Sequence, residues 1–232
     1  MSLHIALIGY GRMGRAIDEL SSTYGCDVVE RLDINNNVEG AGIDDARFAS
    51  VDVAIDFSIA AALATNLPKL AKLGVNLVVG TTGWNADEGA IKQVVKDTGI
   101  GMVHAANFSI GVNVFQAIVD RAATLFEGYD DVGAWIHEGH HAAKVDAPSG
   151  TALALEATMR EAGYMHGIDV SSTRAGTMPG THTVGFDGPF ETITLTHTTR
   201  DRATFARGAL EAARWIKGKR GWFTMRDVLG LK

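Results

Sequence analysis

The chain has 232 residues, of which 46% are hydrophobic and 21% charged, and its formal net charge at pH 7 is −6. This composition is typical of a globular protein with one large domain or two smaller ones. The negative charge argues against a nucleic-acid-binding surface. No signal peptide and no membrane-spanning apolar run is visible, so we expect no membrane association. The single cysteine, Cys26, excludes a disulfide framework and favours a reducing, cytoplasmic setting.

The first half of the chain alternates strand-like and helix-like segments. Apolar strand patterns occupy residues 4–8, 27–32, 52–57, 75–79 and 100–105, and helical spacing occupies residues 12–24, 60–73 and 87–98. Strands separated by helices of this length form βαβ units. The sequence therefore predicts an α/β fold with a parallel sheet in this half.

The pattern changes after Asn107. Long helices are predicted over residues 111–126 and 149–162, and strands over 130–138, 181–185 and 191–198, the last two flanking an Asp-Gly turn. A final helix is predicted over residues 205–217. We therefore expect two domains: a dinucleotide-binding domain of residues 1–107 completed by residues 206–232, and a substrate-binding and oligomerisation domain of residues 108–205.

A G-x-G-x-x-G motif lies between the first predicted strand and the first predicted helix. Its glycines let the backbone approach a pyrophosphate, and the N–H groups at the helix start attract it. Asp33 closes the next predicted strand, where a carboxylate accepts hydrogen bonds from a ribose. Asp33 favours NADH over NADPH, although Arg31 and Arg12 leave the second cofactor open. The predicted loop comprises Gly9, Tyr10, Gly11, Arg12, Met13 and Gly14.

Two further segments follow predicted strands. Because ligands bind at the carboxyl ends of parallel strands, both segments are expected beside the glycine loop, and a plain turn is the alternative for each. The residues are Gly80, Thr81 and Thr82 in the first segment, and Ala105, Ala106, Asn107 and Phe108 in the second.

Residues 137–141 read His-Glu-Gly-His-His and match the zinc hydrolase pattern H-E-x-x-H. That pattern needs His137 and His141 on one face of a helix, with Glu138 as general base. The internal Gly139 and the strand-like residues before it weaken the helix. A zinc hydrolase remains an alternative of a different class, and we expect no metal.

The same segment also predicts an anion site. Pro148 to Thr151 precede a strong helix former, so the N–H groups of Gly150 and Thr151 are suited to a carboxylate. Lys144 adds a positive charge or donates a proton, and one of His140 and His141 can act as general acid. The alternative is that these histidines only satisfy buried carbonyl groups.

These motifs together resemble the dihydrodipicolinate reductase family nearly end to end. The resemblance rests on G-Y-G-R-M-G-R at 9–15, V-V-G-T-T-G at 78–83, A-A-N-F-S-I-G-V-N at 105–113, E-G-H-H-A-A-K-V-D-A-P-S-G-T-A at 138–152, P-G-T-H-T-V at 179–184 and M-R-D-V-L at 225–229. It implies a Rossmann-type domain plus an α+β substrate domain with an open mixed sheet, assembled as a homotetramer.

The resemblance also implies the chemistry, a hydride transfer from NADH or NADPH to a small cyclic dicarboxylate of lysine and diaminopimelate biosynthesis. It implies that His140 donates a proton and that Lys144 donates a proton or holds a carboxylate. His141, Gly150 and Thr151 would bind the substrate, and the residues around Gly80 and Asn107 would contact the nicotinamide. Another nicotinamide-dependent dehydrogenase of an amino-dicarboxylate and a silent nucleotide sensor are the remaining alternatives.

The chain departs from the family pattern in three places, the first being the compact glycine loop, which has Tyr10 between the glycines and one residue fewer than some relatives. The connection between Ala162 and Gly176 is short, and longer members carry an extra strand there, so we expect only a reduced connection. Asp33 stands where other members carry a glutamate–arginine pair, which favours NADH.

Overall fold

The structure is a computed structural model, and it describes residues 2–231. The chain forms two compact units. One comprises the residues up to Ile110 together with those from Ala203 onwards, and the other comprises Gly111–Arg202. The C-terminal segment therefore returns to the first unit.

The first unit is built on a six-stranded parallel sheet with the order β10-β5-β4-β3-β1-β2, as the alternating pattern predicts. Its strands are β1 (Leu3–Ile8), β2 (Cys26–Leu32), β3 (Val53–Asp56), β4 (Asn76–Val79), β5 (Gly101–His104) and β10 (Gly221–Thr224). Its α-helices are α1 (Arg12–Ser21), α2 (Asp45–Phe48), α3 (Ala60–Lys72), α4 (Glu88–Thr98), α7 (Ala203–Ile216) and α8 (Met225–Leu229).

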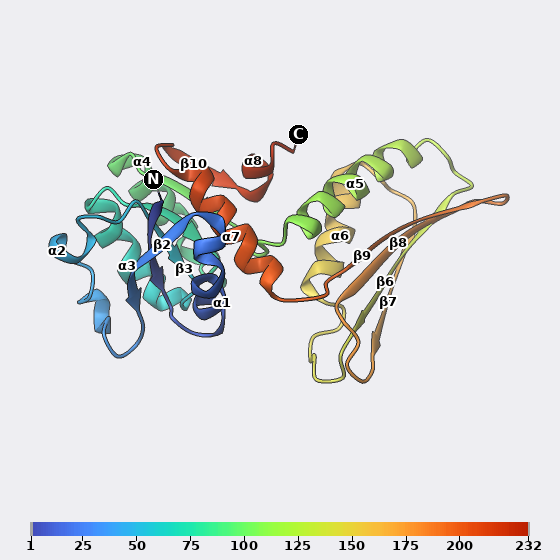
Figure 1. The fold of residues 1–232 in the computed structure, drawn as a ribbon. Helices are drawn as coiled ribbons and strands as arrows, with labels where there is room; N and C mark the ends of the chain where they lie inside the picture. The colour runs from blue at the N-terminus through green and yellow to red at the C-terminus, as the bar shows by residue number, and fades with distance from the viewer. Residues whose placement is uncertain (1, 232) are drawn as a thin grey trace. The chain divides into compact units, whose positions relative to one another are not determined.

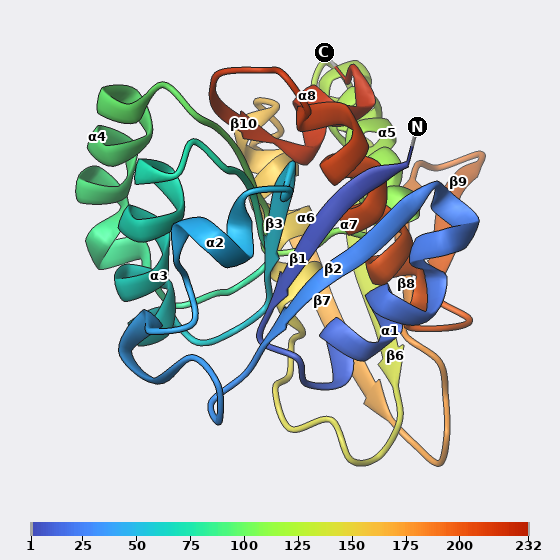
Figure 2. The ribbon, with the colours of Figure 1, turned by 60° about the vertical axis from the view of Figure 1, so that its left-hand side comes forward.

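Helices cover both faces of this sheet (Figure 2). Leu63, Leu67 and Leu70 of α3 pack in one core with the sheet residues Leu77 and Val79. The opposite core joins α1 and α7 to the other face of the sheet. The inner strands β1, β3, β4 and β5 are buried on both faces and are therefore almost continuously apolar, whereas the edge strand β2 carries charged residues.

The second unit contains a four-stranded mixed sheet with the order β7-β6-β8-β9 (Figure 1). The β6–β7 pair is parallel, and the β6–β8 and β8–β9 pairs are antiparallel. The predicted hairpin around Asp187 is therefore confirmed. The elements are α5 (Ile110–Phe126), β6 (Gly133–His140), α6 (Gly150–Glu161), β7 (Ile168–Arg174), β8 (Thr181–Asp187) and β9 (Thr192–Thr198).

Only one face of this second sheet is covered by helices among residues 111–202. Phe115 and Val119 of α5 and Leu155 of α6 pack against Ile136 and Val184 of the sheet. The other face carries threonine pairs between β8 and β9, with Oγ1–Oγ1 distances of 3.1 Å for Thr183–Thr196 and 3.2 Å for Thr181–Thr198. The opposite face of these strands is packed against the helices. A shift of one residue in the pairing would move the apolar side chains to the open face, so the strand register is strongly specified.

The prediction of a mere reduced connection over residues 162–176 was wrong. The segment contains β7, which pairs with β6 from Ala134–Ile168 to His140–Arg174. Its apolar residues alternate with polar ones, but most of its side chains are polar because it lies at the sheet edge. Edge strands give a weak hydrophobic signal for this reason. The short elements α2, α8 and β10 were also not predicted.

Within residues 2–231, no helix combines the length and the apolar character needed to cross a bilayer.

Gly208 in α7 tests the packing of the first unit. A Cβ at this position would lie 1.7 Å from the carbonyl oxygen of Phe108. We expect Gly208→Ala to lower stability by about 1–3 kcal/mol, because overpacking outweighs the gain in helix propensity. Thermal unfolding followed by circular dichroism measures the change.

Gly89→Ala in α4 is the matched control, since nothing lies within 4 Å of its added Cβ. This control should keep or raise the melting temperature. Equal melting temperatures for both variants would contradict the packing argument.

Candidate active site

The histidine-rich segment of β6 is a strand, so its side chains alternate between the two faces of the sheet. His137 contacts Ser171 and Thr173 on β7, with distances of 3.0 Å and 3.5 Å to their hydroxyl oxygens. Glu138 and His140 lie on the other face, beside α6. The helix that a zinc hydrolase motif requires is absent from residues 133–140, so the zinc alternative was wrong in its geometry.

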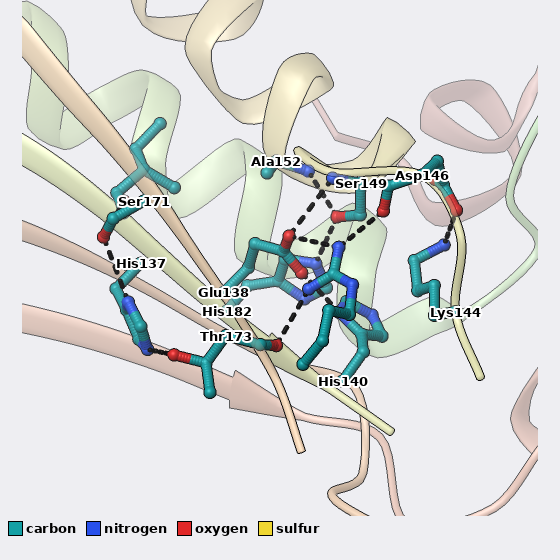
Figure 3. A network of polar contacts seen from close by, with 12 residues as sticks. His137, Glu138, His140, Lys144, Asp146, Ser149, Ala152, Ser171, Thr173 and His182 are labelled. Carbon is teal, nitrogen blue, oxygen red and sulfur yellow. Dashed lines mark hydrogen bonds and ion pairs between the residues drawn. The ribbon is translucent and has the colours of Figure 1, made fainter. Parts of the chain in front are cut away.

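Glu138 is the centre of a polar network (Figure 3). Its side chain is fully buried. Its Oε1 accepts a hydrogen bond of 2.6 Å from Nη2 of Arg174 and one of 3.3 Å from the backbone N–H of Ser149. Its Oε2 contacts Nδ1 of His140. The strand register explains the set, because Arg174 on β7 is paired with His140 on β6.

His182 on β8 completes the network from the other side of Glu138. The two residues are directly paired across the β6–β8 ladder. Nε2 of His182 lies 3.1 Å from the hydroxyl of Ser149, which also caps α6 by accepting from the N–H of Ala152. The rings of His140 and His182 meet edge to face, 5.1 Å apart.

Glu138, His140 and His182 each offer a potential metal-ligand atom, and these atoms lie within 4.8 Å of one another. The guanidinium of Arg174 already neutralises the carboxylate at 2.6 Å. A cation placed among these atoms would therefore meet a fixed like charge. The donor set fits an internal ion-pair network better than a metal centre.

Burial and nearby charges act differently on the pKa values of the two neighbouring imidazoles, His140 and His182. Burial, together with the nearby His140, lowers the pKa of His182 to about 4. Burial also lowers the pKa of His140, but the Glu138 carboxylate opposes this shift. Burial raises the pKa of Glu138, yet the hydrogen bond from Arg174 and further bonds from Ser172 and His140 outweigh it and bring this pKa to about 2.

The predicted substrate-binding residues lie where β6 leads into α6. The Nζ of Lys144 donates to the Asp146 carboxylate at 2.7 Å. The Lys144 hydrogen bond holds the pKa of Asp146 below its usual range, although burial opposes this shift, and the backbone N–H of Gly150 contributes to the lowering. A carboxylate therefore already sits close to the start of α6. Gly150 and His141 are exposed, and Thr151 is half-buried.

In the first unit, the predicted glycine loop joins β1 to α1. Gly9 has a φ of +86°, and a Cβ there would lie 2.6 Å from the carbonyl oxygen of Phe57. A Cβ on Gly14 would lie 2.7 Å from the oxygen of Gly9. Gly11 precedes α1 without a side-chain cap, and its Cβ would meet nothing within 4 Å. The loop therefore offers an open helix start that fits a pyrophosphate.

Several residues near this loop are engaged with one another. Tyr10 donates to Asp18 at 2.5 Å, and Arg31 binds the same carboxylate through Nε at 2.7 Å. Arg31 is thus committed to an internal ion pair. Asp33, at the end of β2, accepts from the backbone N–H of Asn35 at 2.8 Å. Arg12 is exposed and Met13 is half-buried.

The segments after β4 and β5 contain the other residues that the sequence predicts to bind the cofactor, and only some of these residues are at the surface. Thr82 and Ala106 are exposed, and Ala105 and Asn107 are half-buried. Thr81 and Phe108 are buried in the first unit. A Cβ on Gly80 would lie 2.1 Å from the Phe57 ring, so Gly80 is required for packing as well as for its turn.

Asp56 organises these loops and was missed by the sequence analysis. Its Oδ1 accepts from the Thr81 hydroxyl at 2.7 Å and from the Ser58 hydroxyl at 2.6 Å. Burial raises the pKa of Asp56, although these hydrogen bonds oppose the shift. The one available signal was an acidic residue at the end of an apolar strand.

Arg174 and His182 were missed as well. Their contacts depend on which residues of β7, β6 and β8 stand opposite one another. The pairing of Glu138 with His140 was readable, because residues two apart on a strand share a face.

Comparisons with known proteins agree across the chain. A family-wide sequence model described as "Dihydrodipicolinate reductase, N-terminus" matches residues 3–108. The one described as "Dihydrodipicolinate reductase, C-terminus" matches residues 111–229. A Christiangramia forsetii protein named 4-hydroxy-tetrahydrodipicolinate reductase is 37% identical over 238 residues, covering 98% of both chains.

Other relatives carry the same name. The Methanocorpusculum labreanum protein is 43% identical over 196 residues, covering 78% of this chain and 76% of its own. The Laribacter hongkongensis protein is 38% identical over 261 residues, covering 96% of both chains.

Solved structures resemble the fold. A dipicolinate-bound dihydrodipicolinate reductase from Paenisporosarcina sp. TG-14 has a TM-score of 0.82 at 20% identity, covering 97% of this chain and 98% of that one. A C. glutamicum DAP dehydrogenase in complex with DAP has a TM-score of 0.52 at 15% identity, covering 97% of this chain and 93% of that one. Both likenesses concern the fold alone. The two family models and the end-to-end relatives establish that this chain belongs to the dihydrodipicolinate reductase family.

Proposed function

We propose that His140 is the proton donor in the reaction of this family, the NAD(P)H-dependent reduction of 4-hydroxy-tetrahydrodipicolinate to tetrahydrodipicolinate in lysine and diaminopimelate biosynthesis. The observation that carries the proposal is the ion-paired network of Glu138, His140 and Arg174 beside the start of α6. In this network the charges of Glu138 and Arg174 set the pKa of the His140 imidazole. The imidazole lies next to the N-terminus of α6, which is suited to bind a carboxylate.

The substrate carboxylates are proposed to bind at the start of α6. The N–H groups of Gly150 and Thr151 would donate to one carboxylate, with His141 as a further partner. The Lys144 ammonium lies 2.7 Å from the Asp146 carboxylate. On substrate binding, Lys144 would release Asp146 and pair with a substrate carboxylate instead. Its charge then stabilises the negative charge that develops during reduction.

NAD(P)H, when bound, supplies the hydride. The residues proposed to hold it are the glycine loop from Gly9 to Gly14, Asp33 on the ribose side, and the loops around Thr82 and Asn107. His140 then transfers the proton from Nε2 to the reduced ring and is left as a neutral imidazole. Loss of the 4-hydroxyl group as water gives the conjugated imine that accepts the hydride, and the proton from His140 balances the negative charge that hydride addition leaves on the ring.

The general-acid role predicts that His140→Ala lowers kcat by about 10²–10⁴-fold. The measurement is the loss of reduced-nicotinamide absorbance in an assay coupled to the synthase that forms the substrate. His166→Gln is the matched control, because His166 contacts the backbone oxygen of Glu127 instead of the Glu138 network. An unchanged kcat in His140→Ala would remove His140 from the mechanism.

The same role fixes the sign of the pH dependence. Activity needs protonated His140, so kcat/KM should fall as the pH rises through the His140 pKa, which burial holds below its ordinary value in the free protein. A bound dicarboxylate raises that pKa. The falling limb of kcat should therefore lie at higher pH than the falling limb of kcat/KM.

We propose that NADH is favoured over NADPH, because the Asp33 carboxylate would repel a 2′-phosphate and Arg31 is paired with Asp18. Asp33→Ala should raise the KM for NADH more than the KM for NADPH in steady-state assays. Asp27→Ala, an exposed carboxylate on the same strand β2, is the control. Equal effects on both cofactors in Asp33→Ala would contradict the assignment.

We propose that the chain works as a homotetramer in the cytoplasm. The support for assembly is the face of the second sheet that α5 and α6 leave open, with its threonine pairs. The support for the location is the composition, with one cysteine, Cys26, which is buried and unpaired.

The assembly proposal is tested by Thr196→Arg on the open face. Burying four unpaired guanidinium groups is costly, so the variant should elute as a smaller species in size-exclusion chromatography with light scattering. Thr98→Arg, on the exposed side of α4, should leave the tetramer intact. A wild-type protein that is monomeric at micromolar concentration would refute the proposal.

A further inference from the structure

The Glu138 carboxylate has no role in the reaction described so far. Its side chain is fully buried, so a substrate meets it only through its neighbours. It is ionised at neutral pH, since the hydrogen bond from Arg174 outweighs burial and brings its pKa to about 2. A buried carboxylate is costly unless it is paired, and each of its contacts therefore constrains the partner as well.

We propose that Glu138 is a positioning residue for the reductase: fixed by Arg174 and the Ser149 N–H, it holds the His140 ring through Nδ1 and makes Nε2 the atom that gains and gives up the proton. An ionised carboxylate only accepts hydrogen bonds, so Nδ1 must carry a hydrogen. This inference rests on the proposed role of His140.

Gly180, directly before β8, supports the orientation of the ring. A Cβ on Gly180 would lie 3.1 Å from Nε2 of His140 and 3.3 Å from its Cδ2. The missing side chain leaves Nε2 uncovered on that side. No hydrogen bond within residues 2–231 engages Nε2, whereas Nδ1 is taken by Glu138.

The charged and titratable groups around His140 come from four elements. Glu138 precedes it on β6, Arg174 lies on β7, His182 lies on β8, and the Lys144–Asp146 pair lies in the loop before α6. Burial disfavours the protonated ring, and Lys144 and Arg174 act in the same direction. Glu138 is the group that opposes them, so it favours the protonated ring.

Two substitutions are expected to act in opposite directions. Glu138→Gln removes the opposing charge, so the His140 pKa and the falling limb of kcat/KM should move to lower pH. Arg174→Gln removes a cation and leaves Glu138 in place, so both should move to higher pH. We expect kcat at pH 7 to fall by about 10–100-fold in Glu138→Gln, as for other partners that orient a functional histidine.

The His140 pKa and tautomer are measured directly by NMR titration of the imidazole ring, assigned with His140→Gln. Wild-type protein should show the hydrogen on Nδ1 in the neutral ring, and Glu138→Gln should weaken that preference. Glu138→Asp, which keeps the charge, should restore part of the wild-type pH profile. Circular dichroism establishes that each variant is folded, and Arg174→Gln carries the test if Glu138→Gln does not fold.

Glu127→Gln is the matched control, because Glu127 lies 3.9 Å from His166 in the same unit and is partly exposed. It should leave the His140 titration unchanged. Identical His140 titrations in wild type, Glu138→Gln and Arg174→Gln would overturn the positioning role even if His140 proves essential. If the His140 pKa shifts in opposite directions in Glu138→Gln and Arg174→Gln but His140→Ala keeps full activity, the electrostatic effect of Glu138 on His140 would stand. The proposed role of His140 as proton donor would then be wrong.

Discussion

The buried carboxylate of Glu138 is the constraint on which the second unit depends. An ion without water is tolerated only where its oxygens are fully paired. Arg174 comes from β7, the Ser149 N–H from the start of α6, and His140 from β6 itself. One carboxylate thus joins a central strand, an edge strand and a helix end. The start of α6 and the imidazole beside it are held in one fixed relation for this reason.

The first unit depends on close approach of backbone to backbone. Side chains are excluded at Gly9 and Gly14 because added Cβ atoms would lie within 2.7 Å of carbonyl oxygens. The turn can then present the uncapped start of α1 at the end of β1. Asp56 extends the same organisation to the next loops by binding Ser58 and Thr81. The proposed cofactor site of the first unit thus depends mainly on backbone groups, and the proposed substrate site of the second unit depends mainly on ionised side chains.

The sequence was informative wherever the signal is local. The glycine turn, the alternation of strands and helices, and the hairpin around Asp187 follow from residues close together in the chain. The strand β7 was missed because an edge strand carries few apolar residues. Arg174 and His182 were missed because their partners are fixed by strand register. The H-E-x-x-H string shows the reverse error, since a pattern defined on a helix has a different meaning when its residues alternate on a strand.

The structure also distinguishes the proposed proton donor, His140, from the neighbouring imidazole of His182. His140 and His182 are both shielded from water, and burial lowers the pKa of each. His182, with a pKa of about 4, stays neutral and contacts the Ser149 hydroxyl through Nε2. His140 differs in its direct contact with Glu138, which favours its charged form. Two imidazolium rings 5.1 Å apart would repel each other, so a neutral His182 lowers the cost of protonating His140. The two imidazoles differ because only the His140 ring contacts the Glu138 carboxylate. That contact follows from the two-residue period of β6, which places Glu138 and His140 on the same face of the strand.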